Sequence, residues 1–425
     1  MPKRVNLISL GCPKNLVDSE KMLGTLGAAG NIVCARPQDS DIIIINTCGF
    51  VTPALEETEE TIAQVLKDAN NGTKVYVVGC AVNRYADTLK TKFPAVSGWF
   101  TLEDEAKLIA SIETKAAGMD SRLPTTHGYA YLKISDGCSN DCSYCTIPSI
   151  KGPHHSTDFN EIIKEAFELV ELGIRELIVI GQDTTRYGSD LYGRPRLREL
   201  LRELSQIPKV EWLRIMYAHP KTIDHGIIEE IAQNKKICKY IDLPIQHIND
   251  RLLSVMNRKT SRDDIENILA RLKTIDDMSI RTTIIVGFPT ETDDEFNELM
   301  DFLGEGHFDW VGIFPYYREQ GTCAAELRQI PKEVIERRYA EAVSLQQRII
   351  NKKNQSRIGS RLEVLVSSRE QVFIGHAKCT APEIDSQILI TGEGLKLGGI
   401  YEVQITGTKD YDMLGEQVLN KAKEQ

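Results

Sequence analysis

The chain has 425 residues, of which 41% are hydrophobic and 26% are charged. This length exceeds what one ordinary hydrophobic core covers, so two or three domains are expected. The formal net charge of −10 argues against an extended nucleic-acid footprint. No apolar run approaches the roughly 18 residues of a membrane span, and the first residues do not form a signal-peptide pattern. We therefore expect a cytoplasmic protein without a membrane partner.

The first region, residues 1–115, alternates short apolar strands with amphipathic helices. Strands are expected at 5–10, 41–46 and 74–79, and helices at 17–30 and 53–70. This alternation predicts a parallel α/β sheet, because parallel strands need a crossover connection that is usually a helix.

A cysteine follows each of these three strands: Cys12, Cys48 and Cys80. The carboxyl ends of strands in an open α/β sheet form the ligand crevice, so these cysteines should converge in space. One such cysteine is most often a buried small residue, but three with the same placement favour a shared metal site. The remaining cysteines outside this set and outside the segment 136–145 are interpreted as packing residues: Cys34, Cys238, Cys323 and Cys379.

The second region, residues 124–354, contains six longer β/α units and ends in a helix at 332–355. Strands are expected at 131–135, 176–181, 212–218, 240–246, 281–288 and 310–317, with helices at 158–173, 197–207, 227–234, 262–275 and 293–306. Six units are fewer than the eight of a full barrel, so the pattern predicts an open six-stranded (β/α) partial TIM barrel.

Polar residues gather at the carboxyl ends of these strands, where the active face of such a barrel lies. Each alone is as readily a capping group as a reactive one, so the shared position is the informative feature. The strand ends carry Cys138, Cys142 and Cys145, Gln182 and Asp183, His219, Gln246 and His247, and Gly287.

The third region, residues 357–425, consists of short alternating runs at 362–368, 371–377, 387–392 and 401–407, separated by turn residues. This pattern predicts a small antiparallel β-barrel. The region holds eight basic and ten acidic residues. That balance suits a basic protein partner better than an RNA backbone.

The segment DGCSNDCSYC, residues 136–145, places three cysteines in one turn without a fourth nearby. Three thiolates on a cubane iron–sulfur cluster leave one iron free to bind a substrate or cofactor. A zinc site completed by His154 or His155 is the alternative, although zinc sites more often pair their cysteines as two C-x2-C knuckles.

This motif, its place after a strand and the six β/α units resemble the radical S-adenosylmethionine superfamily. The three-region layout is similar to its methylthiotransferase family, whose last module is called TRAM. Several segments resemble the branch of the family that modifies a ribosomal protein: SLGCPKNLVDSE, NTCGF, GCSNDCSYCTIPS, GQDTTRYG, DLPIQH and APEIDSQILI. The transfer-RNA branch typically has glutamine and methionine where Pro13 and Lys14 stand here.

The resemblance implies two 4Fe-4S clusters and S-adenosyl-L-methionine as cofactors. Cys138, Cys142 and Cys145 would hold the catalytic cluster, which binds S-adenosylmethionine at its open iron and cleaves it to a 5′-deoxyadenosyl radical. Cys12, Cys48 and Cys80 would hold a second cluster that presents the sulfur, which another S-adenosylmethionine methylates. The cofactor-binding residues implied in this way are Tyr144, Gln182, Asp183, Gln246 and Gly287.

The implied reaction adds a methylthio group to the β-carbon of an aspartate in small-subunit ribosomal protein S-twelve. An electron donor such as flavodoxin or ferredoxin would be the second partner, and nucleic acid is not expected as a direct substrate. Two alternatives stay open at this point: a transfer-RNA adenosine methylthiotransferase, and a non-enzymatic ribosome- or RNA-binding protein with structural metal sites. The sequence KGPHHSTDF stands where the family is commonly arginine-rich, and Thr290 stands where glycine is usual.

Overall fold

The structure is a computed structural model that describes residues 2–112 and 122–419, and it divides into two compact units. Unit 1 holds the described residues up to Thr125 together with 137–140 and 145–154. Unit 2 holds 126–136, 141–144 and the described residues from His155 onward. The predicted domain ends at 115 and 425 lie outside the described residues, and the three predicted ranges stay predictions.

Unit 1 is built on a five-stranded sheet of order β2-β1-β3-β4-β5 in which every pair is parallel. All six residues of β3 are buried, because helices cover both faces of a parallel sheet. The strands are β1 (Arg4–Ser9), β2 (Ile32–Val33), β3 (Ile42–Thr47), β4 (Lys74–Gly79) and β5 (Gly98–Phe100). The helices are α1 (Pro13–Ala28), η1 (Pro37–Asp39), α2 (Thr52–Asp68), α3 (Cys80–Lys92), η2 (Leu102–Asp104), α4 (Glu105–Ile112) and α5 (Ile147–Lys151).

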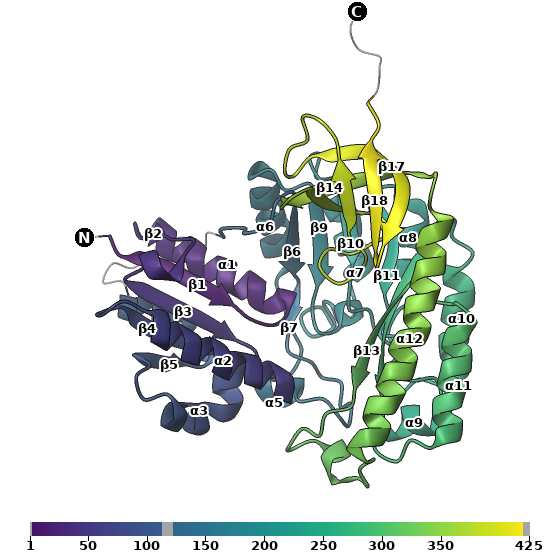
Figure 1. The fold of residues 1–425 in the computed structure, drawn as a ribbon, viewed down its shortest axis with the longest axis horizontal. Coiled ribbons are helices and arrows are strands. Elements are labelled where there is room, and N and C mark those ends of the chain that lie inside the picture. Colours follow the sequence, from purple (N-terminus) through teal and green to yellow (C-terminus); the bar gives the residue numbers. More distant parts are fainter. Residues whose placement is uncertain (1, 113–121, 420–425) are drawn as a thin grey trace, which may run out of the picture. The chain divides into compact units, whose positions relative to one another are not determined.

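Unit 2 contains the predicted open barrel, a six-stranded parallel sheet of order β13-β12-β11-β10-β9-β6 (Figure 1). Its strands are β6 (Tyr129–Lys133), β9 (Glu176–Ile180), β10 (Trp212–Ile215), β11 (Ile237–Asp242), β12 (Ser279–Val286) and β13 (Trp310–Pro315). A two-stranded ribbon pairs β7 (Ser135–Asp136) with β8 (His155–Ser156).

Helices surround this barrel, and apolar residues on their inward faces join the strands in one large core. They are α6 (Phe159–Glu171), η3 (Thr184–Arg186), α7 (Leu197–Gln206), α8 (His225–Gln233), α9 (Asp250–Val255), α10 (Arg262–Leu272), α11 (Asp293–Gly304), η4 (Cys323–Glu326) and α12 (Lys332–Ser356). The long helix α12 runs beside β13, the last strand of the sheet (Figure 1).

The chain ends in a closed five-stranded barrel of order β14-β15-β16-β18-β17. Its pairs are antiparallel except for β16 and β18, which are parallel. The strands are β14 (Arg361–Arg369), β15 (Phe373–Ala377), β16 (Ile388–Thr391), β17 (Ile400–Lys409) and β18 (Asp412–Gln417). The predicted small β-barrel is therefore confirmed, with β18 as an additional strand.

Residues 376–385, which belong to this closed barrel, fill the amino-terminal mouth of the open barrel. Buried charged side chains hold this segment in place. The Nε of Arg214 donates to Glu176 (2.8 Å), and its two terminal nitrogens donate to the carbonyls of Ala377 and Lys378 (both 3.0 Å). The ring of His376 bonds the other carboxylate oxygen of Glu176. Although burial favours the neutral acid, Arg214 and His376 lower the pKa of Glu176 to about 2.

Candidate functional site

The three strand-end cysteines of unit 1 lie where their adjacent strands stop. Cys12 is the residue before α1, Cys48 directly follows β3, and Cys80 is the first residue of α3, directly after β4. Because β1, β3 and β4 are neighbours in the parallel sheet, their carboxyl ends meet at one edge. The structure therefore brings this predicted trio together.

Two residues around this edge set its shape, and the sequence did not single out either. Gly11 has φ +86°, and a Cβ there would lie 2.9 Å from the Cys48 sulfur. Asn15 donates its side-chain amide to the carbonyls of Leu10 (3.1 Å) and Thr47 (3.0 Å), which joins two strand ends. The other side-chain atom of Asn15, its oxygen, lies 3.8 Å from the Cys80 sulfur.

The charged forms of these thiols disfavour one another. Burial raises the pKa of Cys80 to about 12, the Lys151 ammonium opposes that rise, and the charges of Cys48 and Cys12 add to it. Burial also raises the pKa of Cys48. A cationic centre bound at this edge would displace the protons from the thiols and stabilise all three thiolates. The three sulfur donors fit an iron–sulfur cluster, and the glycine at position 11 leaves room for the Cys48 side chain.

The second trio lies in the loop between β7 and α5, through which the boundary of the two units runs. Cys138, Cys142 and Cys145 are all partly exposed. In unit 1, the backbone N–H of Asn140 donates toward the Cys138 sulfur (3.4 Å), and that of Cys138 donates to Gly152 (3.1 Å). An N–H that donates to a cysteine sulfur, as that of Asn140 does, is typical of iron–sulfur sites.

In unit 2 a buried arginine faces the middle cysteine of this loop. A terminal nitrogen of Arg258 lies 3.5 Å from the Cys142 sulfur, and the other donates to the carbonyl of Pro244 (2.6 Å). Only 6% of Arg258 is exposed. A fixed guanidinium stabilises a thiolate electrostatically, so this residue also suits a cluster ligand at Cys142.

The predicted cofactor-binding residues of unit 2 lie at the carboxyl ends of its strands, with differing surroundings. The Tyr144 ring packs edge-on against Phe288, at 6.3 Å between centroids. Gln182 donates to the Asp136 carboxylate (2.7 Å), while its own side-chain oxygen is buried without a hydrogen-bond partner among the described residues. Asp183 is buried and accepts from the Thr185 hydroxyl (2.6 Å).

The other two predicted contacts are backbone features. Gln246 has φ +73° and exchanges backbone hydrogen bonds with β12, donating to Thr283 (2.8 Å) and accepting from Ile285 (2.9 Å). Gly287 has φ +72°, and its N–H donates to the Glu291 carboxylate (2.8 Å). These residues shape the end of the barrel through their main chain.

Two strand-end histidines have different surroundings from each other. His247 is fully buried and lies 3.2 Å from Glu291, which in turn accepts from Arg338 (2.6 Å), so it belongs to a structural network. His219 is 8% exposed; burial and then the charges of Arg258 and Arg186 lower its pKa to about 3. It is therefore neutral at physiological pH.

Within the described residues, no group of three or more His, Cys, Asp or Glu side chains is arranged to hold a single metal ion. A cubane cluster spreads its thiolates over separate iron atoms, so this finding concerns single ions. Among the same residues, no helix is both long enough and apolar enough to cross a membrane.

Family comparisons match all three parts of the chain. The family described as "Radical SAM superfamily" matches residues 132–303, and "TRAM domain" matches 358–418. "Uncharacterized protein family UPF0004" matches residues 4–101.

Similar proteins match over nearly the whole length. The "Ribosomal protein uS12 methylthiotransferase RimO" of Acetivibrio thermocellus is 40% identical and covers 100% of both chains. The protein of the same name from Aquifex aeolicus is 40% identical over 97% of this chain and 96% of its own. This chain belongs to the RimO family. It is accordingly a radical S-adenosylmethionine methylthiotransferase, and RimO membership implies a 4Fe-4S cluster and S-adenosylmethionine.

Solved structures share the fold of this RimO family member at low identity. The radical S-adenosylmethionine methyltransferase TsrM from Kitasatospora setae, with tryptophan and a cofactor analogue bound, has a TM-score of 0.59 at 13% identity. The match covers 83% of this chain and 90% of TsrM. The likeness confirms the predicted α/β architecture, without bearing on the substrate.

Proposed function

We propose that this enzyme adds a methylthio group to the β-carbon of an aspartate in ribosomal protein uS12, the small-subunit protein S-twelve. The observation that carries the proposal is the match at about 40% identity, end to end, with relatives named for that activity. The substrate is a ribosomal protein, so the reaction would take place in the cytoplasm. The electron donor would be a small redox protein such as flavodoxin or ferredoxin.

Each cysteine trio would hold its own 4Fe-4S cluster. The loop trio, Cys138, Cys142 and Cys145, would ligate the cluster that binds S-adenosylmethionine. Bound together, these cofactors supply the hydrogen-atom abstraction that an unactivated aspartate β-carbon requires. Support for this assignment comes from the N–H donors at Cys138 and Cys142.

The strand-end trio, Cys12, Cys48 and Cys80, would hold the second cluster and thereby position the sulfur to be transferred. The protein's own contribution here is to hold the three thiols at one edge, although burial favours the neutral forms of Cys48 and Cys80; the bound cluster would displace their protons. Gly11 would leave room for the Cys48 side chain, and Asn15 would fix two of the strand ends. Around the first cluster, Tyr144, Gln182, Asp183, Gln246 and Gly287 would form the cofactor pocket.

The test compares two triple variants after reconstitution without oxygen. Changing Cys138, Cys142 and Cys145 to alanine should halve the bound iron, from about eight atoms, and abolish 5′-deoxyadenosine formation. Changing Cys12, Cys48 and Cys80 to alanine should also halve the iron, but spare 5′-deoxyadenosine and abolish methylthio-aspartate on uS12. Both products are measured in one reaction by mass spectrometry. A folded strand-end triple variant that still modifies uS12 would rule out the two-cluster assignment.

A further inference from the structure

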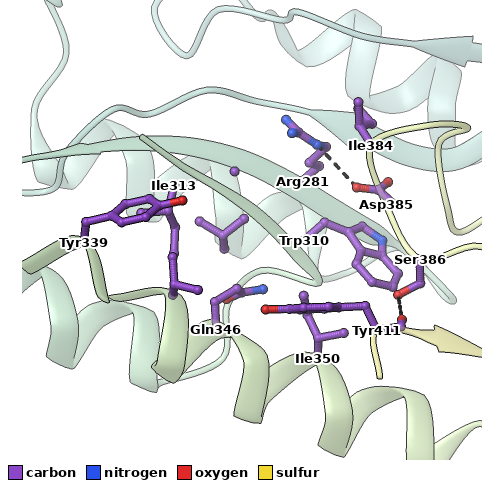
Figure 2. A pocket seen from close by; sticks show the side chains of 13 residues that line it. Arg281, Trp310, Ile313, Tyr339, Gln346, Ile350, Ile384, Asp385, Ser386 and Tyr411 are labelled. Atoms are coloured by element: carbon purple, nitrogen blue, oxygen red, sulfur yellow. Dashed lines mark hydrogen bonds and ion pairs between the residues drawn. The ribbon is translucent and has the colours of Figure 1, made fainter. Parts of the chain in front are cut away.

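The free edge of β13 lies in a hollow of about 260 Å³. Figure 2 shows side chains that reach this hollow from α12, from β13 and from the loops of the closed barrel. Tyr339, Ile384 and Tyr411 are each more than a third exposed, so they form its open rim. The hollow lies entirely within unit 2.

A buried amide without a partner points into this hollow. Gln346 belongs to the buried stripe of α12, which also carries two other polar residues, Arg338 and Asn354. Arg338 donates to Glu291, and Asn354 donates to Tyr411, so both side chains have hydrogen-bond partners. Gln346 is 4% exposed, lines the hollow, and has an amide nitrogen with no hydrogen-bond partner among the described residues. A buried donor of this kind calls for an acceptor beyond the described residues, which a water molecule or a bound ligand supplies.

The adjoining strand edge offers further donors. Asp309, just before β13, donates its N–H to Ile280 at the start of β12 (2.8 Å). Successive residues of a strand point their N–H groups in opposite directions, so those of Gly312 and Phe314 face away from β12. Phe314 itself is 51% exposed. An extended polypeptide that pairs with a strand edge accepts hydrogen bonds from N–H groups of this kind.

The charges of the hollow favour a peptide over a nucleic acid. Arg281 is the one Lys or Arg among its described lining residues. Its guanidinium is already committed, with a bond to Asp242 (2.9 Å) and an ion pair with Asp385 (3.3 Å). Among those described residues no lining cation is left to neutralise a phosphate, whereas aromatic faces and carbonyl-seeking donors suit a polypeptide.

We propose that an extended segment of uS12 pairs with the free edge of β13 and gives an acceptor oxygen to the amide of Gln346. This docking proposal rests on the proposed function, since it takes uS12 as the protein bound. β13 runs toward the carboxyl-end face of the open barrel. A paired segment therefore leads to the face that carries Gln182, Gln246 and Gly287.

The experiment measures binding of purified uS12 to the full-length enzyme, with two matched pairs of variants. Gln346→Leu removes the buried donor, and Gln347→Leu makes the same change at an exposed neighbour. Phe314→Pro removes an outward N–H, which an edge strand tolerates, and Phe314→Ala removes the ring alone. We expect Gln346→Leu to weaken binding about five- to tenfold and Gln347→Leu to leave it unchanged. Phe314→Pro should weaken binding several-fold more than Phe314→Ala.

Two further measurements separate the possible failures. Adding uS12 should slow hydrogen exchange at Gly312 and Phe314, and 5′-deoxyadenosine formation without uS12 should be the same in Gln346→Leu as in wild type. If wild type modifies uS12 while all four variants bind equally, docking at β13 is wrong and the proposed function stands. If wild type forms 5′-deoxyadenosine but neither binds nor modifies uS12, both proposals fall. Edge protection that grows with enzyme concentration without uS12 would assign the edge to a second copy and overturn the docking proposal.

Discussion

Gly11 tests whether the strand-end trio of unit 1 needs an open edge. Gly11→Ala would place a Cβ 2.5 Å from the Cβ of Cys48, at a φ of +86° that other residues rarely adopt. We expect this variant to lose about half of its iron, because the Cys48 thiol must move. The measurement is iron content after reconstitution, alongside 5′-deoxyadenosine formation, which should persist.

Gly72→Ala is the matched control for this change. Gly72 has φ +93°, but a Cβ added there would meet no described atom within 4 Å. Alanine at this position therefore brings backbone strain of about 1 kcal/mol without a clash. Equal iron loss in both variants would mean that strain, and not the space beside Cys48, causes the effect.

Arg258 is the residue that we expect to tune the loop cluster. Gln at this position would remove a buried positive charge 3.5 Å from the Cys142 sulfur and so destabilise the reduced, more negative state of a bound cluster. The midpoint potential should fall, by about 60 mV for each 1.4 kcal/mol of lost stabilisation in a one-electron couple. Potentiometric titration followed by electron paramagnetic resonance measures it.

Arg251→Gln provides the comparison, because Arg251 pairs with Glu295 on the surface (2.6 Å). The midpoint potential of the cluster in Arg251→Gln should match that in wild type. Arg258→Lys, which keeps the charge, should recover part of the shift. A potential in Arg258→Gln that equals the wild-type value would leave Arg258 as a packing residue only.

At the scale of elements, the buried ion network between β9, β10 and the closed barrel predicts a pH effect. Glu176→Gln leaves Arg214 buried with a weaker partner, so we expect a loss of about 3 kcal/mol in the free energy of unfolding at pH 7. The folded pKa of Glu176 is lowered to about 2. Its contribution is therefore fully present above about pH 4.5 and is lost as the pH falls toward 2.

Urea unfolding at several pH values measures this effect, and the deficit of Glu176→Gln should shrink as the pH falls below 4.5. Glu211→Gln is the control, because Glu211 pairs with Arg175 at the surface and should contribute less than about 1 kcal/mol. A deficit that does not change with pH would assign the loss to packing instead of charge.

Elements with strong local patterns could be predicted from sequence, and those that depend on neighbours could not. The apolar runs of β3 and β4 are typical of buried parallel strands. By contrast, β2 has two residues and β5 three, so their pairing partners define them. The strand β18 carries a glycine and two acidic residues, and its pairs with β16 and β17 close the barrel.

The residues of the candidate site also divide into those that could be predicted from sequence and those that could not. The position of Cys12, Cys48 and Cys80 just after three strands was enough to predict that they lie close together. Arg258 is 116 residues from Cys142 and belongs to no motif, so only the folded chain reveals it. His247 looked like its strand-end neighbours in sequence, yet its bond to Glu291 makes it part of the framework.

At the scale of the whole molecule, the net charge of −10 predicts how the substrate arrives. A protein that binds ribosomal RNA presents basic residues, so opposite charges should accelerate its encounter with this enzyme. We expect the association rate of uS12 to fall about tenfold or more between low salt and about 0.5 M salt. Stopped-flow mixing measures it, and transfer RNA serves as a polyanion control that should not bind. A rate independent of salt would contradict this steering.

The plug formed by residues 376–385 also bears on how the protein is made. Arg214 and Glu176 lie in the open barrel, but the carbonyls of Ala377 and Lys378 that complete their network are synthesised some 160 residues later. In a nascent chain that stops before this segment, the Arg214 guanidinium lacks two of its acceptors and the mouth of the open barrel stays uncovered. Prematurely ended chains should therefore keep a loosened barrel that proteases recognise.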